Sequence, residues 1–234
     1  MSYFIFKGKD SREYGILESL PLDIRAERTT QIINMPAGTP IIYESKAFKA
    51  QTVNMTLGLR DNSPDNIREI NSWLYGRGKL ILSNEPDKYY DAVCNTAIQG
   101  TRMVKNLGKI PVNFTVMPYR YAIENEWQEM SISSTWVSYI NNDCMCTLQP
   151  TIKIYGNGEL NFTLKDKSSV TVRNVSEYCI IDVPTRRVYN KDGNIILNET
   201  VGNILNIELE PGTNTFYWKA NTQKVEIKLN KRWL

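Results

Sequence analysis

The sequence predicts a mainly β protein that contains one short helix. Most segments alternate apolar and polar residues with a period of two, which is typical of half-buried strands, and residues 51–60 are the clearest case. Turn residues separate these segments at short intervals, so the strands are expected to be short. Residues 64–75 are the exception, because their apolar residues fall at helical spacing.

In the first half of the chain, strands are expected on both sides of that helix. The alternating segments are residues 3–8, 29–35, 50–61 and 110–123. The pair Tyr14-Gly15 interrupts any helix in the segment that follows the first strand, and a turn is expected from Pro36 to Gly38. Pro118 is expected to interrupt the last of these strands.

The helix has recognisable start and stop signals. Ser63 is a suitable N-cap and Pro64 fits the first turn. Gly76 stands where a left-handed C-cap is expected, and Gly78 is expected to let the chain reverse into the strand 79–83. One face of the helix carries the apolar residues Ile67, Ile70, Trp73 and Leu74.

A domain boundary is predicted near residue 125, which gives domains of residues 1–125 and 126–234. Residues 122–148 are polar, with isolated Trp127 and Trp136, whereas short strands with turns follow them. A hairpin is expected through Gly156-Asn157-Gly158, and two strands are expected to pair across Pro211-Gly212. This regular spacing predicts a β-sandwich.

Composition and charge favour a folded protein and exclude an electrostatic nucleic-acid binder. Hydrophobic residues make up 41% of the 234 residues, and the net charge is +3. Residues 1–124 contain 16 basic and 13 acidic residues, and residues 125–234 contain 12 of each. Because no apolar run approaches the roughly 18 residues of a membrane helix, and the first residues lack a secretory pattern, we expect synthesis in the cytoplasm and no membrane partner.

Catalysis, metal binding and cofactor binding are not expected. The chain has no histidine, so the Ser-His-Asp and Cys-His arrangements are impossible. Four cysteines without a zinc spacing are interpreted as free thiols with no disulfide: Cys94, Cys144, Cys146 and Cys179. Paired carboxylates can hydrolyse glycosides, but the pairs Glu124 with Glu126 and Glu208 with Glu210 are interpreted as residues of solvated surfaces. The glycines at 76–79 and 156–158 lack the spacing of a phosphate-binding loop and are interpreted as turn residues.

Sugar binding stays open as an alternative. Exposed aromatic rings stack on sugar rings, and four aromatic residues lie in or beside the predicted sandwich: Trp127, Trp136, Tyr217 and Trp218. Single aromatic residues of a β-sandwich are more often core residues or interface anchors.

The order of the motifs resembles the distal tail protein (Dit) family of long non-contractile-tailed bacteriophages and prophages. The best matches are "WLYGRGKL" at 73–80 and the Pro86-Asp87 pair before "YYDA" at 89–92. Shorter matches precede and follow them: Gly8, Asp10-Ser11, Gly15-Ile16, Pro36-x-Gly38, and Phe114 ahead of Pro118-Tyr119-x-Tyr121. In the second half, "QPTIKIYGNGELNFTL" and "ELEPGTNTFYW" complete a resemblance that covers essentially the whole chain.

The resemblance implies a structural role without enzymatic activity. It implies an N-terminal β-rich domain with one helix, six copies of which close into a ring at the tail tip, and a C-terminal galectin-like β-sandwich. The implied partners are other copies of the chain, the tail tube protein, the tail-associated lysin or tip protein, and receptor-binding proteins. The implied location is the virion tail tip, with assembly in the host cytoplasm.

The subunit contact is predicted on residues 86–90. Pro86 and Asp87 are expected to form the end of a projecting hairpin that continues into Tyr89 and Tyr90. Tyrosine is favoured at interfaces because it buries a large ring while its hydroxyl keeps a hydrogen bond. On alternation alone, one of the two tyrosines is expected to face the core.

Overall fold

Strands dominate the computed structural model, which describes residues 2–36, 38–95, 101–104 and 107–234. The prediction of a mainly β fold with one α-helix in the described residues is confirmed. The chain divides into one unit of residues 1–123 together with Leu234 and a second unit of residues 124–233. The predicted roles of the two domains, ring formation and a galectin-like sandwich, stay predictions.

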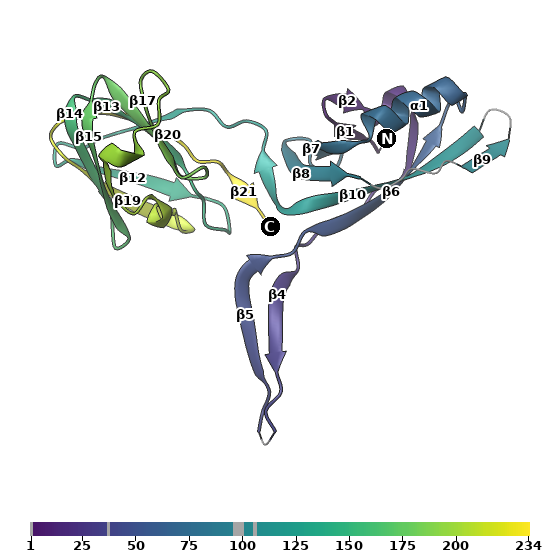
Figure 1. Cartoon of the computed structure of the whole chain (residues 1–234), viewed down its shortest axis with the longest axis horizontal. Coiled ribbons are helices and arrows are strands. Elements are labelled where there is room, and N and C mark those ends of the chain that lie inside the picture. The colour runs from purple at the N-terminus through teal and green to yellow at the C-terminus, as the bar shows by residue number, and fades with distance from the viewer. Residues whose placement is uncertain (1, 37, 96–100, 105–106) are drawn as a thin grey trace. The chain divides into compact units, whose positions relative to one another are not determined.

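The first unit is built on an antiparallel sheet with the strand order β2-β1-β7-β8-β10-β6-β3, in which β9 also pairs with β10 (Figure 1). Among the described residues, strands β4 and β5 pair only with each other and form a separate hairpin. The elements of this unit are β1 (Phe4–Phe6), β2 (Lys9–Asp10), a 3-10 turn (Ser11–Glu13), β3 (Gly15–Ser19), β4 (Arg28–Ile33), β5 (Ile41–Phe48), β6 (Gln51–Leu59), α1 (Pro64–Trp73), β7 (Gly76–Leu82), β8 (Lys88–Cys94), β9 (Thr101–Val104) and β10 (Leu107–Ala122).

Helix α1 covers one face of this sheet. Ile70, Trp73 and Leu74 are buried and belong to the same core as Phe4, Phe6 and Phe114 on the strands. The Trp73 ring stacks on Phe4, and its indole nitrogen Nε1 donates a hydrogen bond to the carbonyl oxygen of Phe6 at 2.7 Å. The apolar stripe read from the sequence therefore fixes which face of the helix meets the sheet.

The helix starts as predicted, but its end differs from the prediction. The Ser63 hydroxyl accepts a hydrogen bond from the amide of Asn66, as an N-cap does. Leu74, not Gly76, is the C-cap; Gly76 opens β7 with a φ of +81°. Gly78 does not reverse the chain either. It lies within β7, where a Cβ would stand 2.5 Å from Cγ of Lys7 and 3.1 Å from the Phe6 ring, so it is needed for close packing.

Pro118 bends the long strand β10 without ending it. The register against β8 shifts between Val116 and Arg120, and the strand then continues to Ala122. A bulge accommodates the residue that cannot donate to the ladder, so Pro118 interrupts the pairing with β8 while the strand itself continues.

The second unit is a sandwich of two five-stranded sheets, with the orders β11-β20-β13-β16-β17 and β12-β19-β14-β15-β18 (Figure 1). Both sheets contribute to one core, for example through Ile152 and Ile181 from the first and Phe162 and Phe216 from the second. The elements are β11 (Gln128–Met130), β12 (Val137–Asn142), β13 (Thr151–Gly156), β14 (Gly158–Leu164), β15 (Ser168–Val175), β16 (Tyr178–Asp182), β17 (Arg187–Asn190), β18 (Thr200–Gly202), β19 (Gly212–Trp218), β20 (Thr222–Lys228), β21 (Arg232–Trp233) and 3-10 turns at Leu197–Glu199 and Ile204–Asn206.

The turn at residues 156–158 carries the chain from one sheet to the other and is not a hairpin. Strand β13 pairs with β16 and β20, whereas β14 pairs with β15 and β19. Gly156 lies so close to the turn before β20 that a Cβ would meet the carbonyl oxygen of Asn221 at 2.3 Å. The pairing across Pro211-Gly212 is also wrong, because β19 begins at Gly212 and pairs with β12 and β14.

Candidate assembly surfaces of the first unit

The four residues predicted to lie at a subunit contact occupy a tight connection and the start of β8. Pro86 and Asp87 lie in the turn between β7 and β8, and Tyr89 and Tyr90 are the second and third residues of β8. This connection does not project as expected. Backbone hydrogen bonds join Glu85 to Leu82 and Lys88 to Glu85, which close it into a short turn.

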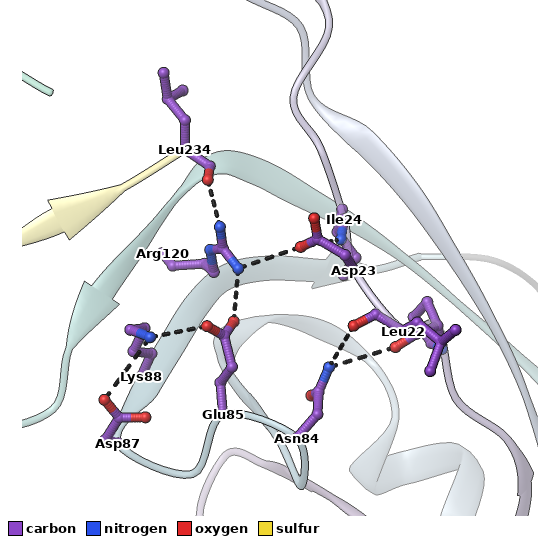
Figure 2. A network of polar contacts seen from close by, with 10 residues as sticks. Leu22, Asp23, Ile24, Asn84, Glu85, Asp87, Lys88, Arg120 and Leu234 are labelled. Carbon is purple, nitrogen blue, oxygen red and sulfur yellow. Dashed lines mark hydrogen bonds and ion pairs between the residues drawn. The ribbon is translucent and has the colours of Figure 1, made fainter. Parts of the chain in front are cut away.

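A network of charged groups fixes the turn to the sheet (Figure 2). One carboxylate oxygen of Glu85 accepts from Lys88 at 2.8 Å, and the other accepts from Arg120 on β10 at 2.8 Å. Burial acts to raise the pKa of Glu85, but these two hydrogen bonds outweigh it, so the pKa lies below its usual value. The group therefore stays ionised, and the turn has one defined position.

The same network holds the chain that leads into the β4–β5 hairpin. The Asn84 amide donates to the carbonyl oxygen of Leu22 at 3.0 Å, and Arg120 also donates to the Asp23 carboxylate at 3.3 Å (Figure 2). Strand β4 begins at Arg28, a few residues later. Asn84, which lies just before the predicted contact residues, and Arg120 on β10 thus hold the chain that leads to the hairpin.

Tyr89 and Tyr90 point to opposite faces of the sheet. Tyr90 is buried at 5% exposure with the helix-covered core, as alternation predicted for one of the pair. Tyr89 lies on the other face, where its ring stacks on Tyr121 with centroids 5.6 Å apart and Lys79 Nζ lies 4.3 Å above it. Of the two rings, that of Tyr89 is the one available to a partner.

Alkaline pH is expected to destabilise the first unit through Tyr90. Burial raises the pKa of Tyr90 to about 12, whereas a tyrosine in an unfolded chain titrates near 10. A raised folded-state pKa stabilises the fold fully below about pH 10, and this contribution is lost as the pH rises toward 12. The urea midpoint should therefore fall more steeply over this range for the parent chain than for Tyr90→Phe. Tyr43→Phe, at an exposed tyrosine, is the control, and equal slopes for all three proteins would contradict the prediction.

The β4–β5 hairpin is the most unusual surface of this unit. In Figure 1 it extends away from the sheet, and every residue of β4 is exposed. Large apolar side chains are exposed on both of its strands, including Ile32 at 62% and Ile42 at 64%. Isolated two-stranded hairpins are marginally stable in water, and exposed apolar patches mark interaction sites.

Both faces of the hairpin are apolar near its end. Ile32 pairs with Ile42 on one face, and Ile33 pairs with Ile41 on the other. Charged side chains lie at the base, where Arg28 contacts Glu44 at 3.0 Å and Lys49 contacts Glu27 at 2.9 Å. From Thr29 to Tyr43 the sequence has no charge. This pattern fits a segment that is covered on both faces in an assembly.

Sequence reasoning predicted a strand and a turn here but missed the exposed hairpin. Period-two alternation shows that a strand has two faces, whereas it does not show whether another layer covers them. A signal was present in the two Ile-Ile pairs, 32–33 and 41–42, which stand on either side of the turn without a nearby charge. Consecutive apolar residues in both arms indicate a hairpin with two apolar faces.

The residues considered for chemistry and sugar binding lie in different places. Cys179 is buried, which raises the pKa of its thiol to about 12, and Cys146 donates from Sγ to the carbonyl oxygen of Arg232. Glu208 accepts from Gln149, and Glu210 pairs with Lys167. Of the four aromatic residues, Trp218 belongs to the core, whereas the others are at least 36% exposed: Trp127, Trp136 and Tyr217.

Among the described residues, no cluster of three or more His, Cys, Asp or Glu side chains is arranged to hold a metal ion. The described helices do not include one with the length and apolar character needed to span a membrane.

Comparison with solved structures shows the fold to be that of phage tail-tip components. The structure of the Dit protein of phage SPP1, described as a paradigm of the hub adsorption apparatus in phages that infect Gram-positive bacteria, matches with a TM-score of 0.82 and 16% identity over 100% of both chains. Structures of the phage p2 baseplate in its activated conformation, with Sr and with Ca, match with a TM-score of 0.52, at 12% and 11% identity, over 98% of this chain and 97% of those chains. No protein-family model and no curated protein matches the chain. The resemblance to the distal tail protein is confirmed at the level of the fold.

Proposed function

We propose that this chain is a distal tail protein, six copies of which form a ring that joins the tail tube to the tail-tip apparatus. The observation that carries the proposal is the match to SPP1 Dit over the full length of both chains. The ordered sequence motifs support it independently, because they depend on residue identity and not on the fold. Fold alone does not establish function, so the surfaces must also suit assembly.

The β4–β5 hairpin supplies a surface of that kind, and its proposed occupant is a second copy of this chain. A closed ring requires each subunit to present two different patches to its neighbours. The projecting hairpin is one of them. The second is the uncovered sheet face around Tyr89 and Tyr121, where the half-buried side chains of Ile81 and Val93 add apolar surface.

The proposed partners beyond the chain itself are the tail tube protein, the tail-associated lysin or tip protein, and receptor-binding proteins. The proposed location is the virion tail tip, after assembly in the host cytoplasm. The protein acts there as a structural connector without catalysis, in keeping with the hub and baseplate components that share its fold.

Sedimentation velocity over a wide concentration range, with and without the tail-tip partner, tests the ring. Association must offset several kcal/mol of lost freedom, so an equilibrium between monomer and hexamer is expected, and the partner should shift it toward hexamer. A chain that stays monomeric in both conditions, or that forms a tight two-fold dimer, would overturn the proposal.

A substitution at Tyr89 tests whether the predicted contact lies on β8. Tyr89→Ala removes the half-buried ring of the pair, which lies on the uncovered face of the sheet, and should shift the equilibrium toward monomer. Tyr139→Ala in the second unit removes a ring that is 67% exposed and should leave it unchanged. If both variants assemble like the parent, the contact lies elsewhere, although the ring itself could still form.

A further inference from the structure

The β4–β5 hairpin is attached to the main sheet of its unit by two irregular segments. Residues 20–27 lead from β3 into β4, residues 49–50 lead from β5 into β6, and neither segment forms a helix or strand. Among the described residues, the two hairpin strands make no ladder pairing with the main sheet. Ladder hydrogen bonds fix the direction of neighbouring strands, so the direction of the hairpin depends on side-chain contacts at its base.

Two consecutive residues of β10 make such contacts, one with each arm of the hairpin. The Tyr119 ring packs edge to face on Phe48, the last residue of β5, with ring centroids 6.0 Å apart. Arg120 donates from Nη1 to the carboxylate of Asp23, in the segment that enters the hairpin, at 3.3 Å (Figure 2). Adjacent residues of one strand therefore contact both connections of the hairpin.

The bulge of β10 lies at the same place. Side chains of consecutive strand residues normally point to opposite faces of a sheet. The register of β10 against β8 shifts between Val116 and Arg120, a stretch that includes Pro118 and Tyr119. Bulges redirect side chains, so this one explains how residues 119 and 120 both contact the hairpin. The first three residues of the sequence motif at 118–121 thus have a structural role.

Arg120 is the rigid member of its pair with Asp23. The Arg120 side chain is 15% exposed, and the Nη1 that contacts Asp23 also donates to Glu85 at the shorter distance of 2.8 Å. The Asp23 side chain is 67% exposed and lies on the irregular segment. A fixed guanidinium thus defines where the entering segment lies.

We infer that Tyr119 and Arg120 are positioning residues, which keep the β4–β5 hairpin in one direction for docking on a neighbouring copy of the chain. A hairpin that already has its docking direction loses less conformational freedom when it binds. Without these contacts the hairpin samples other directions, and only a fraction of the subunits present it correctly. The purpose of the hairpin rests on the proposed ring, whereas its positioning is a property of the single chain.

Double electron–electron resonance on the monomeric full chain tests the inference. Spin labels carried by p-acetylphenylalanine, in place of Tyr43 on the hairpin and Ser72 on α1, avoid the four cysteines, and both positions are exposed. The parent should give one narrow distance distribution. The population at other distances should rise about two- to tenfold in Tyr119→Ala and about two- to fivefold in Asp23→Asn.

Conservative variants and a matched control separate positioning from a general loss of structure. Tyr119→Phe keeps the ring and Asp23→Glu keeps the carboxylate, so both should match the parent. Asp87→Asn should also match it, because Asp87 is 70% exposed, much like Asp23, and its ion pair among the described residues is with Lys88. The urea midpoint of Asp23→Asn should equal that of the parent, since an exposed ion pair adds little to global stability.

A parental distance distribution in either Tyr119→Ala or Asp23→Asn would overturn the inference, as would equal broadening in Asp87→Asn. The measurement is made below the concentration at which the chain assembles. A failure of the ring would therefore leave its result unaffected.

Discussion

A variant that carries Ile32→Ser and Ile42→Ser is expected to remain monomeric at concentrations where the parent chain assembles. The two side chains pair across the β4–β5 hairpin and are 62% and 64% exposed in the single chain. Burying an aliphatic side chain of this size contributes about 1.5–3 kcal/mol. Loss of both at each contact should therefore weaken association by about 100-fold or more.

The same variant should leave the fold of the single chain unchanged, because neither side chain belongs to a core. Ile195→Ser with Leu197→Ser is the matched control, since these residues of the second unit are 54% and 48% exposed. Sedimentation velocity gives the association, and the urea midpoint gives the stability. Assembly of the hairpin variant with parental affinity would exclude the hairpin from the contact.

The opposite face of the hairpin has its own test. Ile33→Ser with Ile41→Ser changes the pair on that face and leaves the first pair intact. Comparable weakening by both double variants would show that the hairpin is covered on both faces. Weakening by one alone would assign the contact to one face.

Phe114→Ala is expected to destabilise the first unit by about 3–5 kcal/mol while the second unit keeps its stability. Phe114 is fully buried and its ring lies 4.9 Å from that of Phe6 and 5.7 Å from that of Phe4. The two units have separate cores, so a cavity in one removes contacts from that core only. A decrease of this size is a large fraction of the unfolding free energy of a typical domain, which is about 5–15 kcal/mol.

Fluorine NMR of protein labelled with 5-fluorotryptophan distinguishes the units. Trp73 is the tryptophan of the first unit, and the other four of the five lie in the second. In Phe114→Ala, the Trp73 resonance should move to its unfolded position at a lower urea concentration than the other four resonances. Phe216→Ala, in the second core, should reverse the order, whereas simultaneous loss of all five resonances in both variants would contradict independent cores.

The sequence predicted the helix well because its information is local. A capping serine, a proline in the first turn and apolar residues at helical spacing are all found within residues 63–74. The same holds for the alternation in β6 and β10, whose inward residues form the core as expected. Alternation also predicted that one tyrosine of the 89–90 pair faces the core.

The features that sequence reasoning missed depend on contacts between distant segments. The glycines at 156–158 indicate that the chain changes direction, but the partners of β13 and β14 are supplied by residues far along the chain. The sequence suggests a turn at Gly78, whereas a glycine is needed there because the side chains of Phe6 and Lys7 leave no room for a Cβ. The predicted contact residues 86–90 adjoin a charged network in which Arg120 pairs with Asp23 and Glu85, and no local pattern connects these three residues.

The uncharged stretch of the β4–β5 hairpin also determines which proteases can cleave the free chain there. Trypsin requires Lys or Arg, and none stands between Thr29 and Tyr43, so it finds its sites only at the base of the hairpin. Chymotrypsin cleaves beside aromatic residues and can reach Tyr43, which is 62% exposed. The free chain is thus resistant to trypsin and open to chymotrypsin at this segment, and the proposed assembly through the hairpin would protect it from both proteases.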